Sequence, residues 1–320
     1  MDSHQPTKGL SSLIGLQHLK TIAARDVKAS LLTGEIFPNT ALYGNAGLGK
    51  SSVAECICYD LGYYYAMIEG AMCRTRRQVY DRLTTECENA KQSNKPLLFF
   101  IDEAHRLAEE PQEALYYPML TGRITGSEDR LHRFSIFAAT THPYLLLGPF
   151  RSRLQNEWYF CAYEQNEIER MVANWWTQDG FKYDFNSLVA VAKRSLGVPR
   201  NAYNIAKKVR NEALARTGQK RISLENCENT FTLERIDPIG LTSEQVLYLQ
   251  ALGTLNSPPK GIGGIAGTLG RDVEVVSESI EPNLLALGFV ERTARGRILT
   301  AKGFQHLKET NQLPGSSKGQ

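Results

Sequence analysis

A glycine-rich segment near the amino terminus most strongly limits what this chain can fold into. Residues 42–52 read LYGNAGLGKSS, in which two apolar residues precede the spacing G-x-x-x-x-G-K-[ST]. The backbone N–H groups of such a loop surround phosphates, the lysine reaches the outer phosphates and the serine hydroxyl ligates Mg²⁺. Because the motif follows an expected strand and opens an expected helix, we interpret it as a nucleotide-binding P-loop rather than as a glycine-rich helix cap.

A pair of acidic residues supplies the expected second half of a nucleotide site. The segment LLFFIDEAHRL at 97–107 leads through five apolar residues to Asp102 and Glu103. The pattern places Asp102 at the carboxyl end of a buried strand, where α/β proteins bind ligands. We therefore expect Asp102 to belong to the Mg²⁺ shell and Glu103 to polarise an attacking water. An isolated Asp-Glu pair is most often a solvated helix start, but this one follows a P-loop.

The spacing of apolar residues predicts an α/β fold for the first half of the chain. Strand-like runs alternate with helical stretches, which predicts a parallel sheet with helices on both faces. The expected strands are 40–43, 63–68, 97–101, 135–139 and 158–162, and the expected helices are about 50–61, 75–93 and 109–120. We accordingly assign 1–163 to a P-loop domain, 164–238 to a helical domain, 239–310 to a smaller helical and basic domain, and 311–320 to a disordered tail.

Composition excludes several classes of protein. Of 320 residues, 42% are hydrophobic and 22% charged, which is ordinary for a soluble globular protein. The net charge of +3 is only mildly basic, so contact with nucleic acid must come from local patches. The six cysteines show no C-x-x-C spacing, which favours core thiols over a metal site or disulfides. The first ten residues, MDSHQPTKGL, have no apolar stretch and no segment is long enough to span a membrane, so we expect a cytoplasmic location.

Further candidates for a hydrolysis site follow the acidic pair in the chain. FSIFAATT ends a strand with Thr140 and Thr141, and GPFRSRL supplies Arg151 and Arg153. LGVPRNAYNIAKKVR then places Arg200 in the first turn of a helix. Each of these residues alone would more often be a capping threonine or a surface arginine. Their order suggests a polar probe of the γ-phosphate and positive charge for the transition state.

This order resembles the AAA+ ATPases and, within them, the RuvB-like motors of Holliday-junction branch migration. The resemblance covers nearly all of residues 10–308, and it is carried by YGNAGLGKSS, LLFFIDEAHRL, YYPML, FAATT, PFRSRL, GVPRNAYNIAKKVR and EPNLLALGFVERTARGRILT. It implies an AAA+ P-loop domain, a helical lid and a carboxyl-terminal winged helix. It also implies ATP hydrolysis with Mg²⁺ and movement along DNA in recombination and repair.

The resemblance also implies a role for individual residues of the nucleotide site. The residues expected at the nucleotide are Gly44, Gly47, Leu48, Gly49, Lys50, Ser51, Ser52, Asp102, Tyr163 and Arg200. Ser51 and Asp102 would hold Mg²⁺, and Tyr163 would lie near the adenine.

Four residues are implied to take part in hydrolysis itself. Glu103 would be the acidic residue that polarises the attacking water, Thr141 the first sensor and Arg200 the second. Arg153 would be a finger that enters the site of a neighbouring copy, which requires a ring and, by resemblance, a hexamer. Hydrolysis in such a ring depends on assembly, because one chain's site lacks the charge of the finger.

The carboxyl-terminal segment GFVERTARGRILTAKGFQHLK predicts a basic hairpin. Its Arg292, Arg295, Arg297, Lys302 and Lys308 are opposed only by Glu291. Two short strands around TARG would form the wing of the winged helix, whose arginines can bind phosphates. We expect Arg292 and Arg297 to contact the DNA backbone; the alternative is a solvated charged hairpin.

The helix expected before this hairpin, at about 273–287, is acidic. It carries Glu274, Glu278 and Glu281, with Asp272 just ahead of it. Such a helix would be repelled by phosphates and is a poor reader of the major groove. The domain is therefore expected to hold double-stranded or junction DNA without reading its sequence.

One segment departs from the family. RuvB-like proteins carry a long hairpin that docks on RuvA, but here the insert is only TGRITGSEDRLHR at 121–133. It is polar, it lacks an apolar tip, and Thr121, Gly122 and Arg123 replace acidic residues of the family. This argues against RuvA docking and leaves open another partner or none. An ATP-switched clamp loader or helicase loader is therefore the alternative to a motor, and a DNA-bound regulator is a third, weaker one.

Overall fold

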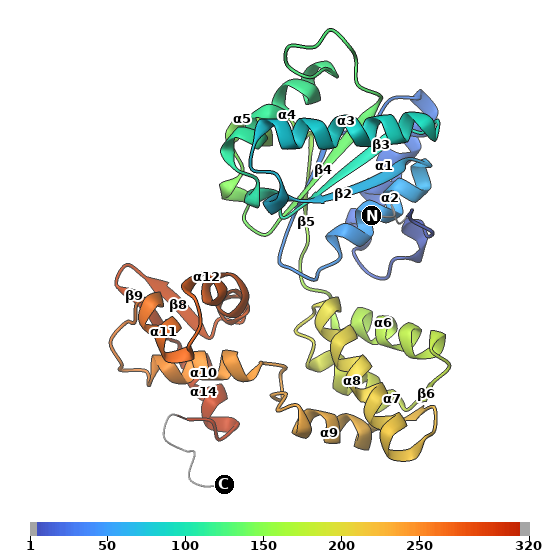
Figure 1. The fold of residues 1–320 in the computed structure, drawn as a ribbon. Coiled ribbons are helices and arrows are strands. Elements are labelled where there is room, and N and C mark those ends of the chain that lie inside the picture. The colour runs from blue at the N-terminus through green and yellow to red at the C-terminus, as the bar shows by residue number, and fades with distance from the viewer. Residues whose placement is uncertain (1–4, 314–320) are drawn as a thin grey trace. The chain divides into compact units, whose positions relative to one another are not determined.

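The computed structural model describes residues 5–313, which form two compact units (Figure 1). Among the described residues, one unit extends through Met171 and includes Val198–Arg200, and the other comprises Val172–Gly197 and continues from Asn201. Of the tail expected to be disordered, residues 314–320 lie outside the described residues, whereas the Gln312 carbonyl accepts a hydrogen bond from Gln250 (2.7 Å). No helix within residues 5–313 is long and apolar enough to cross a membrane.

The first unit is built on a five-stranded parallel sheet, as the sequence predicts. Its strand order is β2-β3-β4-β1-β5. The strands are β1 (Thr40–Tyr43), β2 (Tyr64–Glu69), β3 (Leu97–Asp102), β4 (Phe134–Thr140) and β5 (Asn156–Tyr159). All neighbours pair in parallel, so the carboxyl ends of β1, β3 and β4 meet at one edge of the sheet.

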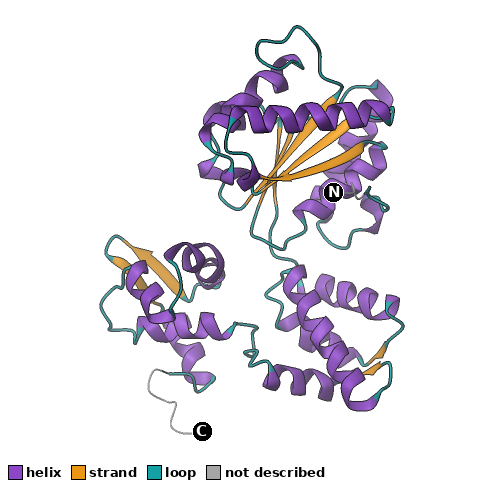
Figure 2. Ribbon diagram, in the orientation of Figure 1, coloured by secondary structure: helices purple, strands orange, loops and turns teal. Residues whose placement is uncertain are grey.

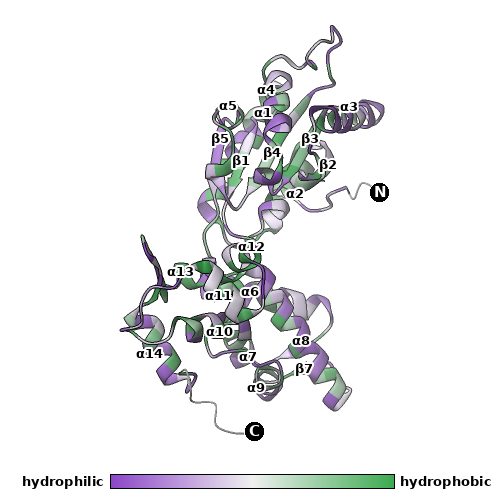
Figure 3. Cartoon of the chain, turned by 60° about the vertical axis from the view of Figure 1, so that its left-hand side comes forward, coloured by the Kyte–Doolittle hydropathy of each residue, from purple (hydrophilic) through white to green (hydrophobic). Residues whose placement is uncertain are grey.

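Helices cover both faces of this sheet (Figures 1 and 2). The helices are α1 (Gln17–Thr33), α2 (Lys50–Leu61), α3 (Arg76–Gln92), α4 (Glu109–Thr121) and α5 (Gly148–Arg151). Alternation along β3 sends Leu98 and Phe100 into a core with α1 and α2, and Phe99 and Ile101 into a second core with α3, α4 and α5. In Figure 3 the strand β3 is mainly in the hydrophobic colour and α3 mainly in the hydrophilic one, because only one face of α3 is buried.

Short 3₁₀ turns join several of these elements. They are η1 (Leu10–Ser12), η2 (Gly70–Met72), η3 (Ala104–Arg106) and η4 (Pro143–Leu145). The sequence misplaced one strand, since β5 was expected at 158–162. It begins two residues earlier because it pairs with the four residues of β1, in the register from Thr40↔Asn156 to Tyr43↔Tyr159. This register is a long-range property that the apolar run WYFCA does not encode.

The region after the sheet is mainly helical, but it also holds two very short strands. The helices are α6 (Gln165–Gln178), α7 (Phe185–Lys193), α8 (Pro199–Thr217) and α9 (Leu224–Leu233). Lys182–Tyr183 (β6) pairs in parallel with Arg221–Ile222 (β7), although we expected helices alone here. Two residues are too few to leave an alternating pattern in the sequence.

The carboxyl-terminal part of the second unit packs around its own core, which includes Tyr248, Ile265 and Leu284. Its elements are α10 (Ser243–Leu252), α11 (Ile262–Leu269), α12 (Val273–Val275), η5 (Val276–Ile280), α13 (Glu281–Ala286), β8 (Val290–Thr293), β9 (Gly296–Leu299) and α14 (Ala301–Glu309). The Thr242 hydroxyl caps α10 in a capping box with Gln245. Strands β8 and β9 form the predicted antiparallel hairpin, and α14 follows it.

The cysteines lie mostly in the core. Cys56 and Cys58, both in α2, are buried, and Cys161 alone of the six is exposed. Among residues 5–313 no cluster of three or more His, Cys, Asp or Glu side chains could hold a metal ion. The prediction of core thiols is therefore confirmed for every cysteine except Cys161.

Candidate active site and nucleic-acid interface

The P-loop lies between the end of β1 and the start of α2. Lys50 is the first residue of α2, and Gly49 before it has a left-handed backbone. Gly44 and Gly47 also have positive φ, at 149° and 81°. A Cβ on Gly44 would lie 2.6 Å from the Phe160 carbonyl oxygen, and one on Gly47 would lie 2.8 Å from the Cβ of Arg200. Glycine is therefore required at both positions by backbone conformation and by space.

Lys50 is directed into this loop. Its side chain is 6% exposed and its ammonium donates to the carbonyls of Gly44 (2.5 Å) and Asn45 (3.0 Å). Burial lowers the pKa of Lys50, while the nearby carboxylates of Glu103 and Asp102 oppose that shift. A phosphate group would replace weak carbonyl acceptors with an anion, which favours the charged ammonium.

The remaining P-loop residues also lie as a phosphate site requires. Leu48 is buried, whereas Ser51 is half-buried and Ser52 exposed in the first turn of α2. The helix thus presents its first N–H groups and the Ser51 hydroxyl at the same end as the loop. This geometry fits an anion at a helix N-terminus.

The acidic pair lies at the carboxyl end of β3. In the sheet, β4 separates this strand from β1, which leads into the P-loop. Asp102 ends the strand, and Glu103 turns the chain with a φ of 45°. Burial raises the pKa of Asp102, the neighbouring Glu103 adds to the effect, and Lys50 and Arg200 oppose it. A cation close to Asp102 would therefore relieve an unfavourable charge.

Glu103 is held by hydrogen-bond donors on two segments. The backbone N–H and the hydroxyl of Thr141 donate to Oε2 at 3.3 and 3.1 Å, and Nδ1 of His105 lies 3.2 Å from the same oxygen. Burial alone would raise the pKa of Glu103, but the bonds from His105 and Thr141 and the charge of Lys50 lower it to about 2. Glu103 is therefore ionised at neutral pH, which suits a group that orients and polarises water.

The two threonines at the end of β4 have different environments. Thr140, the last strand residue, is buried and its hydroxyl lies 2.9 Å from Nδ1 of His105. Thr141, the first residue after the strand, instead donates to Glu103 from its hydroxyl and its backbone N–H. The structure thus places Thr141, and not Thr140, directly at the glutamate that is predicted to polarise water.

Two histidines belong to this cluster, and the sequence reasoning missed both. His105 and His142 lie with ring centroids 4.7 Å apart, and Nδ1 of His142 lies 2.9 Å from the Thr141 hydroxyl. The signal available in the sequence was the position of each histidine just after a candidate site residue, in DEAH and in TTH. A single histidine at such a position is not specific, so only the fold brings the two rings together.

The two arginines of FRSR differ in their partners. Arg151 pairs with Glu157 (2.9 Å) of its own chain. Arg153 instead lies over the ring of Tyr116, 4.6 Å from its centroid, and donates to the Tyr116 hydroxyl at 2.7 Å. Within the described part of the chain no carboxylate pairs with Arg153, and its buried Nε has no partner. The charge of Arg153 is therefore oriented by an aromatic ring but not neutralised.

Tyr163 and Arg200 contact different residues of the P-loop. The Tyr163 hydroxyl donates to the Leu48 carbonyl (3.2 Å), and its ring lies against Gly15. Burial raises the pKa of Tyr163, so the hydroxyl is neutral. The backbone N–H of Arg200 donates to the Gly47 carbonyl (3.4 Å) while its side chain is exposed. The structure thus brings Tyr163 and Arg200, which are distant from the P-loop in sequence, into hydrogen-bond contact with it.

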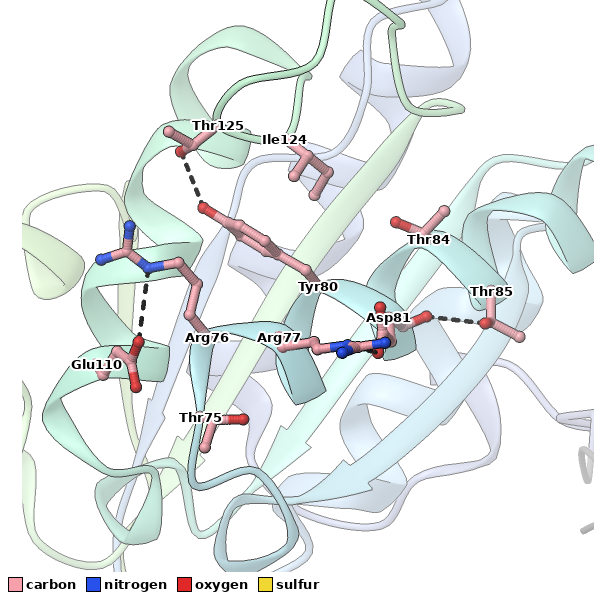
Figure 4. Close-up of a pocket in the computed structure, with 10 residues that line it drawn as sticks. All are labelled: Thr75, Arg76, Arg77, Tyr80, Asp81, Thr84, Thr85, Glu110, Ile124 and Thr125. Atoms are coloured by element: carbon pink, nitrogen blue, oxygen red, sulfur yellow. Dashed lines mark hydrogen bonds and ion pairs between the residues drawn. The ribbon is translucent and has the colours of Figure 1, made fainter.

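A groove of about 880 Å³ lies elsewhere in the first unit, along α3 and the start of the 121–133 segment (Figure 4). Tyr80 donates to the Ala114 carbonyl and bonds Thr125, and Arg76 lies 3.9 Å from Glu110. The segment itself closes through an isolated antiparallel bridge between Arg123 and Arg130. None of the lining residues belongs to the P-loop or to the acidic pair, so the groove is not the nucleotide site.

The hairpin β8–β9 carries the predicted DNA-binding arginines, but their surroundings differ from the expectation. Arg292 and Arg297 oppose each other across the two strands, and Arg295 lies exposed in the turn. We expected these arginines to face only Glu291. Instead, Arg292 and Arg297 both form ion pairs with Glu281, a residue expected on the acidic face of a recognition helix. Glu281 is buried and is not part of that face.

Comparison with known proteins gives a consistent result. Residues 40–162 match the family "ATPase family associated with various cellular activities (AAA)", and residues 238–308 match the "RuvB C-terminal winged helix domain". A Synechococcus sp. (strain JA-3-3Ab) protein named "Holliday junction branch migration complex subunit RuvB 2" is 31% identical over 316 residues, which is 95% of this chain and 83% of that protein. The corresponding Campylobacter concisus protein is 31% identical over 313 residues, covering 95% and 90%.

A solved structure agrees over the same length. The Thermotoga maritima RuvB Holliday junction branch migration motor is 28% identical and has a TM-score of 0.84, with 95% of this chain and 98% of that chain covered. The similarity therefore extends from the P-loop unit through the hairpin.

Proposed function

Because the chain belongs to the RuvB family of AAA+ ATPases, we propose that it is an ATP-driven motor that moves branched DNA in recombination and repair. The observation that carries this proposal is the union, in one chain, of a P-loop site with its acidic pair and a carboxyl-terminal winged helix of the RuvB type. A loader or a regulator needs nucleotide binding and a DNA-facing domain as well, but relatives over nearly the full length are named as branch-migration subunits.

The P-loop would bind the phosphates of ATP. Backbone N–H groups from Gly47 to Lys50 surround them, and the ammonium of Lys50 neutralises the outer phosphates. Ser51 and Asp102 supply the hard oxygen ligands that Mg²⁺ prefers, and the ion would neutralise charge on the phosphates. The donor set fits this ion, since Mg²⁺ usually takes one or two protein ligands beside water and phosphate oxygens.

Glu103 would orient the attacking water for hydrolysis. Its carboxylate is 26% exposed and is fixed by Thr141 and His105 on one oxygen, Oε2. The other oxygen then remains available to accept a hydrogen bond from water. Because the pKa of Glu103 is about 2, the residue acts chiefly by orientation and charge, while the proton leaves with the phosphate product.

Arg153 would complete the site of a neighbouring copy in a ring, which by family resemblance has six members. The ring of Tyr116 holds the guanidinium without cancelling its charge, as a finger requires. Such a cation stabilises the transition state by about 10³- to 10⁵-fold in related phosphoryl-transfer enzymes.

Mixing two inactive variants tests the ring. Glu103→Gln protein retains Arg153, and Arg153→Ala protein retains Glu103. In a mixed ring, a Glu103→Gln copy can insert its Arg153 into the site of a neighbouring Arg153→Ala copy, which retains Glu103. ATP turnover of the mixture should therefore exceed that of either variant alone. Mixtures as inactive as their components, although they assemble, would refute a finger that acts in trans.

The 121–133 segment is short and polar, so we propose that the motor does not need RuvA docked there. The deciding experiment measures ATP turnover and branch movement by the purified chain alone, with a four-way junction or a linear duplex and with Glu103→Gln as the blank. Junction-stimulated turnover with movement of the branch supports the motor. Binding to DNA without turnover or movement would overturn it in favour of a loader that awaits a partner.

A further inference from the structure

Glu281 is the most enclosed carboxylate of the winged helix. Its side chain is 0% exposed, and it begins α13. Oε1 accepts hydrogen bonds from the Tyr248 hydroxyl and from Nε of Arg297, each at 2.7 Å. Oε2 accepts hydrogen bonds from Arg292 and, at 3.3 Å, from Nη2 of Arg297. One buried residue thus links α10, β8 and β9.

The helix before Glu281 explains why this residue points inward. Glu274, Glu278 and Glu281 are spaced i, i+4 and i+7, so an uninterrupted α-helix would place them on one face. Pro282 has no N–H for the Glu278 carbonyl and its ring crowds that turn. The chain widens into the π-helical turn η5, and one added residue rotates the subsequent residues by about 100° around the helix axis. Glu274 and Glu278 stay exposed, whereas Glu281 enters the core.

The backbone fixes the same end of the hairpin. Arg297 exchanges two hydrogen bonds with Lys260, N–H to carbonyl, at 2.8 and 3.0 Å. Gly296 beside it has a φ of 138°, and a Cβ there would lie 2.6 Å from the Lys260 carbonyl oxygen. Arg297 is therefore held by its main chain as well as by its guanidinium.

The three arginines of the wing therefore differ in exposure and in pairing. The side chain of Arg297 is only 20% exposed and that of Arg292 is 52% exposed, and both are directed at Glu281. A buried carboxylate is costly unless it is paired, so these contacts compensate its burial. Arg295 lies in the exposed turn, and no carboxylate in the described part of the chain pairs with it.

We propose that Glu281 is a positioning residue for DNA binding, which orients the wing through Arg292 and Arg297 and leaves Arg295 as the arginine that contacts phosphate. The inference rests on the proposed function, because it assumes that this wing faces DNA. It reverses the simplest reading of the sequence, in which Arg297 contacts the backbone. Arg297 holds the wing in place through Glu281, and Arg292 pairs with Glu281 while about half of its side chain stays exposed to solvent.

Hydrogen exchange of the full-length chain without DNA tests whether Glu281 holds the β8–β9 hairpin in place. Glu281→Gln keeps the shape and removes the charge, and Arg297→Lys keeps the charge and removes the planar fork. Each should increase amide exchange in 290–299 about tenfold, the effect of losing one charge-assisted hydrogen bond. Arg295→Ala is the matched control and should leave exchange unchanged. Unchanged exchange in both Glu281→Gln and Arg297→Lys would overturn the positioning role.

Binding to a random-sequence duplex at several salt concentrations tests whether Arg295 contacts a DNA phosphate. Arg295→Ala should reduce the slope of log affinity against log salt by about 1. Arg297→Ala should weaken binding with the slope unchanged, because the charge that it removes was not at a phosphate. A loss of slope in Arg297→Ala together with normal exchange would instead make Arg297 the phosphate contact and refute the proposal.

The two measurements separate the inference from the function on which it rests. If the wild-type chain bound neither duplex nor junction, the proposed motor and the DNA contact of Arg295 would both fail. The exchange data would still decide whether Glu281 holds the hairpin.

Discussion

Glu103 and Glu281 are two partly or fully buried glutamates whose pKa values are lowered by quite different surroundings. Glu103 is 26% exposed, and neutral donors on Thr141 together with His105 hold one of its oxygens. Glu281 is 0% exposed, and two guanidinium groups and a tyrosine hydroxyl use both of its oxygens. Charge alone therefore does not mark a working carboxylate. A working carboxylate keeps one oxygen available for a substrate or water, and within the described residues Oε1 of Glu103 accepts no hydrogen bond, whereas both oxygens of Glu281 do.

The largest expected effect comes from the working carboxylate. Glu103→Gln should lower ATP turnover by at least about 100-fold, because an amide cannot polarise the water, while nucleotide binding through Lys50 persists. Steady-state turnover and binding of a fluorescent nucleotide measure the two quantities. Glu88→Gln, an exposed change on α3, is the control. Loss of nucleotide binding in Glu103→Gln would mean that the residue supports the loop rather than the chemistry.

The enclosed carboxylate should instead affect stability. Arg297→Ala leaves Glu281 with fewer partners and should cost about 3 kcal/mol of unfolding free energy in the winged helix. Arg271→Ala removes an exposed pair with Glu244 (2.6 Å) and should cost no more than about 1 kcal/mol. Urea titration followed by exchange of residues 243–309 measures both. Equal costs for the two variants would show that the Glu281 cluster contributes no more than a surface pair.

Substitution of Thr141 tests how much a neutral hydrogen-bond donor contributes to the positioning of Glu103. Thr141→Val keeps the shape but removes the hydroxyl that donates to Glu103, so turnover should fall about tenfold. Thr141→Ser retains the hydroxyl and should restore most of the rate. Nucleotide affinity, measured in parallel, should change little in either variant. A normal rate in Thr141→Val would assign the positioning of Glu103 to His105 and the backbone.

The smallest effect is a dependence of stability on pH. Burial alone would raise the pKa of Glu281, but its bonds to Arg297, Arg292 and Tyr248 lower it below the ordinary value of 4.5. Glu281 therefore contributes stability above pH 4.5 that is lost as pH falls through its folded pKa. The difference in unfolding free energy between wild type and Glu281→Gln should shrink from about pH 6 to about pH 3. A difference that grows on acidification would contradict the lowered pKa.

Local patterns in the sequence were sufficient to predict most residues of the candidate nucleotide site, whose roles stay predictions. The P-loop spacing, the apolar run before Asp102 and the threonine pair each lie within one short segment, and parallel pairing brings segment ends to one edge. The histidine pair was missed because its two members lie at the ends of different strands and each is common alone. The catalytic roles and the domain limits remain predictions, and the turnover and mixing experiments address the roles.

What the sequence by itself determined is the order of elements and the chemistry at the end of each strand, since periodicity and motif spacing are local. What only the tertiary structure decided is which charges are free. Glu281 looked like part of an exposed acidic face, yet the π-helical turn forced by Pro282 turned it toward Arg292 and Arg297. Family resemblance distinguished Arg153 from Arg151, but only the fold shows that Arg151 pairs with Glu157 whereas Arg153 lies over a tyrosine ring. Partners distant in sequence set the cost of burying a charge, so a charged residue's role depends on the fold.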